Sequence, residues 1–184
     1  MRKFLIFSTV GVVLITILIL VVVQIQFKNK KSHSPEEEVY FSDGELKLRV
    51  FYNRPYKKNR EIFGGLVPYG KVWRTGANEA TIFETNKTIT IEGKKLSPGT
   101  YSFWTIPDST TWMVIFNSES GHWGINHKGE ANRNPALDVL IIPVHAVKQE
   151  RVFEQFTIAF EKVGEEAEMV LLWDNTVVAV PFWY

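Results

Sequence analysis

After residue 38 the sequence alternates between apolar and polar side chains over short stretches, and this period of two limits the fold more than any other feature. In the segment "GELKLRVFYNRP", Leu46, Leu48 and Val50 would share one face of an extended chain, while Lys47 and Arg49 would share the other. Such alternation is typical of β-strands that bury one face only.

Turn-forming pairs separate these stretches at the spacing of β-hairpins. The pairs are Asp43-Gly44, Asn86-Lys87, Glu92-Gly93, Pro98-Gly99 and Asp174-Asn175. The pattern predicts about nine to ten short antiparallel strands and an all-β fold, either a β-sandwich or a jelly roll, over residues 39–184. The chain has no cysteine, so no disulfide supports this domain.

Ahead of the predicted strands lies an uncharged run, "FLIFSTVGVVLITILILVVVQI", over residues 4–25. A helix of about 20 apolar residues covers the hydrocarbon core of a bilayer, and a buried globular helix would carry a polar face. A cleavable signal peptide has a shorter apolar region and small residues at its cleavage site. We therefore expect an uncleaved transmembrane signal anchor over residues 1–27, followed by a flexible polar linker over residues 28–38.

Charge leaves the orientation of this anchor nearly undecided. Arg2 and Lys3 precede the run, and Lys28, Lys30 and Lys31 follow it, which slightly favours a cytoplasmic C-terminal side. Residues 1–27 hold two of the 21 Lys and Arg and none of the 20 Asp and Glu, so the remainder has a formal charge of −1. No basic stripe stands out, and nucleic acid is therefore excluded as an expected partner.

One long segment, residues 53–79, has neither strand nor helix periodicity. Connections of this length inside a compact domain tend to be functional or disordered. This one contains too many apolar residues for disorder. We expect it to pack against the predicted sandwich and to present its polar side chains in fixed positions, so that residues 54–79 form a binding loop.

The candidate binding residues are Trp73, Arg74, Asn78, Glu79 and Trp123. Arginine offers fixed donors for a carboxylate, a phosphate or sugar hydroxyls, a glutamate can act as acid or base, and tryptophan rings can stack on sugars. The alternative, which the general behaviour of polar loop residues favours, is that Arg74 pairs with a carboxylate inside the domain and that Asn78 caps a turn. Trp112, within the apolar stretch "TWMVIFN", is expected in the core.

No metal site, cofactor or catalytic residue is assigned from the sequence. His122 and His127 are five residues apart, which suits neither one face of a helix nor one face of a strand, and only Glu130 lies near them. No phosphate-binding loop and no G-x-S-x-G nucleophile motif is present.

Several segments resemble the bacterial domain-of-unknown-function family 2911. They are Arg60–Thr81, Gly93–Pro107, Trp112–Asn117, Trp123-Gly124 and Asp138–Leu140. The resemblance covers about residues 39–182 and implies an exported β-rich domain without an established activity, which moves the orientation toward an extracytoplasmic C-terminal domain. The chain departs from the family pattern in its anchor and between Trp123 and Asp138.

These observations predict a single-pass cytoplasmic membrane protein whose extracytoplasmic module binds a glycan, a small molecule or an envelope protein through the 54–79 loop. Two alternatives stay open. One is a hydrolase with Glu79 as acid/base and Arg74 holding an anionic or polar group of the substrate. The other is a purely structural surface protein.

Overall fold

A computed structural model describes residues 2–184 of the chain, apart from the side chains of residues 2–12 and 27–30. The chain divides into two compact units, Met1–His33 and Ser34–Tyr184. The first unit is a helix, and the second contains all the strands.

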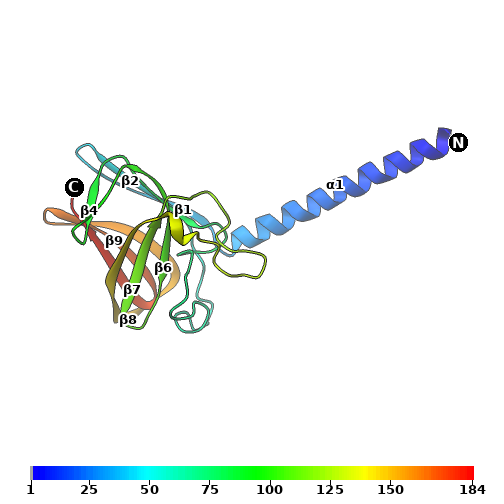
Figure 1. Cartoon of the computed structure of the whole chain (residues 1–184). Coiled ribbons are helices and arrows are strands. Elements are labelled where there is room, and N and C mark those ends of the chain that lie inside the picture. Colours follow the sequence, from blue (N-terminus) through cyan, green and yellow to red (C-terminus); the bar gives the residue numbers. More distant parts are fainter. Residues whose placement is uncertain (1) are drawn as a thin grey trace. The chain divides into compact units, whose positions relative to one another are not determined.

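Helix α1 spans Arg2–Ser32 (Figure 1). Within the part of the chain whose side chains are described, no helix carries a stretch long and apolar enough to cross a membrane. Residues 4–12 of the predicted span lie outside that part. The helix also continues into the segment predicted as linker, and β1 begins at Glu36, so only residues 33–35 separate the two elements. Pro35 accounts for the break, because the residue before a proline is disfavoured in a helix.

The second unit contains nine strands and one short 3-10 helix, η1, and this confirms the predicted all-β class. They are β1 (Glu36–Asp43), β2 (Leu46–Asn53), β3 (Thr81–Thr85), β4 (Ile89–Ile91), β5 (Lys94–Leu96), β6 (Gly99–Ile106), β7 (Thr111–Asn117), η1 (Pro135–Leu137), β8 (Asp138–Val163) and β9 (Glu166–Phe182).

The strands pair differently from a sandwich of two stacked sheets or a jelly roll. Seven of them form one antiparallel sheet in the order β1-β2-β3-β6-β7-β8-β9, and β4 and β5 form a separate hairpin. Figure 1 shows β6, β7 and the first part of β8 side by side in this sheet. The sandwich prediction was wrong on this point, because the alternation of residues specifies which face is buried but not which strands pair.

The long hairpin of β8 and β9 curls the sheet. A straight strand of 17 residues would span about 56 Å. Yet a single carboxylate oxygen of Asp43 accepts hydrogen bonds both from Lys162, near the start of the turn into β9, and from Tyr184, just after the end of β9. β9 therefore bends, and Asp174 has a positive φ of 53° within it. The register of β8 shifts twice between residues 148 and 157, as bulges do where a strand bends.

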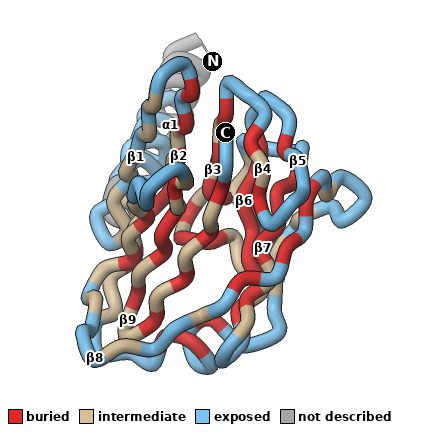
Figure 2. The backbone as a smooth tube through the Cα atoms, turned by 90° about the vertical axis from the view of Figure 1, so that its left-hand side faces the viewer, coloured by how far each residue is buried: buried red, intermediate tan, exposed pale blue. Residues whose placement is uncertain are grey.

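The inner face of the curled sheet holds the core. Buried and less buried positions alternate along strands such as β3 and β9 (Figure 2). The long loop contributes to this core, because Ile62, Phe63 and Val67 are buried in it. Trp112 is 1% exposed, which confirms its predicted position.

The outer face of β6 and β7 is covered as well. Phe103 faces the main core, and its neighbour Trp104 points to the opposite side, yet both are fully buried. A second apolar cluster encloses Trp104, with Ala80 and Ile115 as its other buried members and Ala131 packed against it. The end of the long loop, through Val72 and Ala80, and the loop after β7 thus lie on this face, and they bring the candidate site residues together.

Candidate functional site

The end of the long loop is fastened to β6 by its backbone. The amide of Trp73 donates to the carbonyl of Thr105 at 2.7 Å, and the amide of Thr105 donates back at 3.0 Å. The hydroxyls of Thr75 and Thr105 lie 3.1 Å apart in the interior. Gly76 has a φ of 157°, and a Cβ there would approach the carbonyl oxygen of Asn53 to 3.0 Å, so the turn requires a glycine.

Trp73 packs as a core residue rather than standing out as a stacking surface. Its ring centroid lies 5.1 Å from that of Phe156 and 5.9 Å from that of Trp173, and its indole N–H donates to the carbonyl of Gly76 at 3.0 Å. The ring is only partly exposed. In this arrangement Trp73 orients the loop, and its face is occupied by other aromatic rings.

Asn78 and Glu79 belong to a chain of side-chain hydrogen bonds through Asn53. The Asn78 amide donates to Asn53 Oδ1 at 3.1 Å, and Asn53 Nδ2 donates to Glu79 Oε2 at 3.0 Å. Asn53 is fully buried at the end of β2, and Asn78 is held at a φ of 56°. These hydrogen bonds therefore hold the Glu79 carboxylate from the interior side of the loop.

Arg74 is the unusual member of the site. It is half-buried, and its one side-chain hydrogen bond is donated from Nη1 to the carbonyl of Trp123 at 3.2 Å. Among residues 31–184, no carboxylate oxygen lies within 4.0 Å of its guanidinium. Burial lowers the pKa of Arg74, and the more distant charge of Glu79 partly offsets this effect. The predicted internal carboxylate partner is thus absent from the described part of the chain.

The loop after β7 forms the other side of the site. The His122 ring stacks on Trp104 with centroids 5.7 Å apart, its Nδ1 accepts from the amide of Gly124 at 3.2 Å, and its carbonyl accepts from Ala80 at 3.1 Å. Gly124 has a φ of 84°, which strains any other residue, and a Cβ there would lie 3.1 Å from Cβ of Arg74 and 3.2 Å from Cβ of Ala80, so glycine suits the place where the two loops meet. Trp123, which precedes it, is half-buried.

The geometry thus assembles Arg74, Asn78, Glu79 and Trp123 where two loops meet. Trp73 lies on the core side of the same loop. Sequence reasoning missed Asn53, which connects two of these residues; as one polar residue at the end of a strand, it offered no signal of its buried position. No group of three His, Cys, Asp or Glu side chains that could hold a metal ion occurs in the described structure.

The arrangement offers hydrogen-bond donors, one cation and the Glu79 carboxylate. Asp138, a possible second carboxylate for Glu79, is instead bound to Arg133 and accepts from Asn117 at 2.8 Å. What the site can do chemically is hold a negatively charged group against the Arg74 guanidinium, because arginine pairs well with carboxylate and phosphate.

Comparison with known proteins places these loops in a family. No curated protein and no solved structure matches the chain. The model of a family described as a protein of unknown function (DUF2911) matches residues 34–182, a range that includes both loops and every strand of the curled sheet. The chain therefore belongs to the DUF2911 family of proteins of unknown function.

Proposed function

We propose that this protein is a membrane-anchored, extracytoplasmic binding module, and that it holds an anionic group of its ligand against Arg74. The observation that carries the proposal is the state of that guanidinium. It is half-buried without a carboxylate partner within 4.0 Å among residues 31–184, and its donors other than Nη1 are not sealed from solvent.

A partly buried charge without an ion-pair partner is unfavourable for the apo fold, because no opposite charge compensates for its partial desolvation. Binding sites commonly retain such residues at the expense of stability. The surrounding side chains support this interpretation: Asn53 and Asn78 hold the loop from within, so a ligand would meet an arginine that is already oriented. Preorganisation of this kind improves affinity.

The hydrolase alternative has less support. Glu79 would need a second titratable group that reaches the same substrate atom. Asp138 is engaged by Arg133 and Asn117, and the Nδ1 atom of His122 accepts a hydrogen bond from a backbone amide. A binding role requires only the arginine and the neighbouring donors.

Replacing Arg74 with methionine tests the proposal, because methionine keeps the apolar stem and removes the charge. We expect the free energy of unfolding of the ligand-free chain to change by less than about 1 kcal/mol or to rise. If Arg74 instead neutralised a buried carboxylate, the same substitution would lower the free energy of unfolding by about 3–5 kcal/mol. Urea titrations followed by tryptophan fluorescence measure the difference, since all six tryptophans lie after residue 33.

The ligand itself can be sought by thermal shift on the full-length chain with a panel of carboxylates, phosphate esters and acidic sugars. A ligand that binds the native state must raise the melting temperature. The shift should vanish in Arg74→Met and persist in Arg60→Gln, a matched control in the same loop whose exposed guanidinium also donates to backbone carbonyls. An equal shift in the Arg74 variant, or no shift with any anion of the panel, would contradict the proposal.

The membrane anchor and the outside location are a separate part of the proposal. Their support is the uncharged run of residues 4–25, which lies within one helix, and the exported character implied by the family resemblance. We expect alkaline phosphatase fused after Tyr184 to be active in intact bacteria and a cytoplasmic reporter at the same point to be silent. The reverse pattern of reporter activity would show that the domain faces the cytoplasm.

A further inference from the structure

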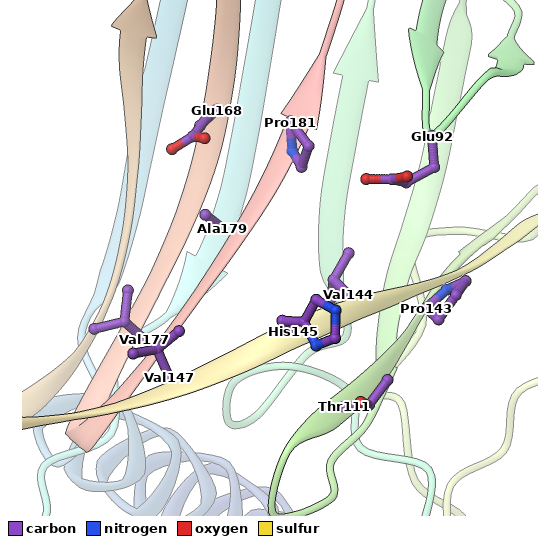
Figure 3. A pocket seen from close by; sticks show the side chains of 10 residues that line it. All are labelled: Glu92, Thr111, Pro143, Val144, His145, Val147, Glu168, Val177, Ala179 and Pro181. Atoms are coloured by element: carbon purple, nitrogen blue, oxygen red, sulfur yellow. The ribbon is translucent and has the colours of Figure 1, made fainter.

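A groove of about 550 Å³ lies on β8 and β9, and Arg74 is not among the residues that line it (Figure 3). Its walls come from the starts of β7 and β8, both ends of β9 and the turn between β4 and β5. The lining residues are Glu92, Thr111, Pro143, Val144, His145, Val147, Glu168, Val177, Ala179 and Pro181. Sites for small ligands commonly have volumes of about 300–1,000 Å³.

The floor of the groove is a row of outward positions on β8. Pro143, His145 and Val147 line the groove and are exposed, and the residues between them are buried or less exposed. They span four residue steps, or about 13 Å of strand, with a repeat of about 6.6 Å between neighbours. Val147, a large apolar side chain, is 58% exposed.

The groove is also acidic. Glu92 reaches it from the β4–β5 turn and Glu168 from β9, and Figure 3 shows Pro181 between them. Neither glutamate makes an ion pair within residues 31–184, and no Lys or Arg lines the groove. Glu168 stands directly opposite Glu161 in the β8–β9 ladder, a like-charge pair that a nearby cation would relieve.

We propose that this groove binds an extended, apolar peptide segment that carries a lysine or arginine side chain. The exposed row along β8 has the two-residue repeat of an extended peptide, and the two carboxylates supply the complementary charge for a basic side chain. The same carboxylates disfavour anionic lipid surfaces, and the occupant differs in charge from the anion proposed for Arg74. The proposals for the two sites are therefore independent of each other.

The test uses the full-length chain in phosphatidylcholine nanodiscs and a fluorescein-labelled hexapeptide of alternating valine and lysine. Fluorescence anisotropy should report saturable binding with a Kd of about 1–100 μM. The same peptide with glutamate in place of lysine should not bind. Equal binding of both peptides, or no binding of the lysine peptide up to about 1 mM, would overturn the proposal.

Matched variants locate the binding. The double variant Glu92→Gln/Glu168→Gln should weaken binding by at least about tenfold, because both complementary charges are removed. Glu150→Gln, which removes an exposed carboxylate of β8 outside the groove, should leave the Kd unchanged. Arg74→Met should also leave it unchanged, which separates this proposal from the one above. Unchanged affinity in the double variant would contradict the proposal, as would a dimer in light scattering that Val147→Ser dissociates, since this face would then bind a second copy.

Discussion

Replacing Trp112 with alanine should lower the free energy of unfolding by about 3–5 kcal/mol, the usual loss for a fully buried large aromatic ring. The ring is 1% exposed and lies 4.8 Å from the centroid of Phe63 and 6.3 Å from that of Trp73. Its indole N–H donates to the carbonyl of Asp108 at 3.1 Å. The substitution would remove the contact between β7 and the long loop and would leave a cavity among aromatic rings that cannot collapse easily.

Urea titration of the full-length chain measures this loss, with the fluorescence of the other five tryptophans as the signal. Trp183→Ala is the matched control, because that ring is 44% exposed beyond the end of β9. The control should change the stability by less than about 1 kcal/mol, as for surface substitutions. A similarly small loss for Trp112→Ala would mean that the ring does not support the junction of the loop with β7.

Replacing Asp138 with alanine should destabilise the protein by a similar amount, about 3–5 kcal/mol, through a different mechanism. Asp138 pairs with Arg133, and the side chains are only 7% and 11% exposed. Asp138 also accepts from Asn117 Nδ2 at 2.8 Å. Removing the carboxylate would leave the Arg133 guanidinium, whose Nε already lacks a partner in the described structure, as an uncompensated buried charge.

A double-mutant cycle separates this effect from a simple loss of packing. Arg133→Met/Asp138→Ala should be less destabilised than Asp138→Ala alone, because no buried charge is left unpaired. Glu45→Ala, which breaks the exposed pair between Lys87 and Glu45, serves as the control and should leave the urea midpoint unchanged. Additive losses in the cycle would show that the two charges do not interact.

The local elements of the fold could be predicted from the sequence because short-range chemistry determines them. Glu92-Gly93 forms the hairpin turn between β4 and β5, and Gly44 lies in the turn between β1 and β2, directly after Asp43 at the end of β1. The turn predicted at Asp174-Asn175 was wrong, because both residues lie within the continuous strand β9, where Asp174 has a positive φ of 53°. The burial of Trp112 follows from its place in an apolar strand.

The candidate site could be predicted only in part. The segment that contains Arg74, Asn78 and Glu79 stood out, because a long connection rich in both apolar and polar residues is rare in compact domains. Some of its side chains are hydrogen-bonded within the protein, and others are open to a ligand. This difference depends on Asn53, Trp123 and Gly124, which come from two other parts of the chain. Contacts between side chains so far apart in the sequence produce no repeating pattern of residues, so the sequence alone does not predict them.

The sequence by itself determined the all-β class, the positions of most turns and the presence of a long structured loop, because period-two alternation and turn-forming pairs act over a few residues. Only the tertiary structure decided that seven strands form one curled sheet, that β8 and β9 bend, and that Arg74 lies half-buried without a carboxylate partner among residues 31–184. The physical reason is the same for each. Strand pairing and burial depend on contacts between segments far apart in the chain, and alternation constrains only the face that each residue occupies.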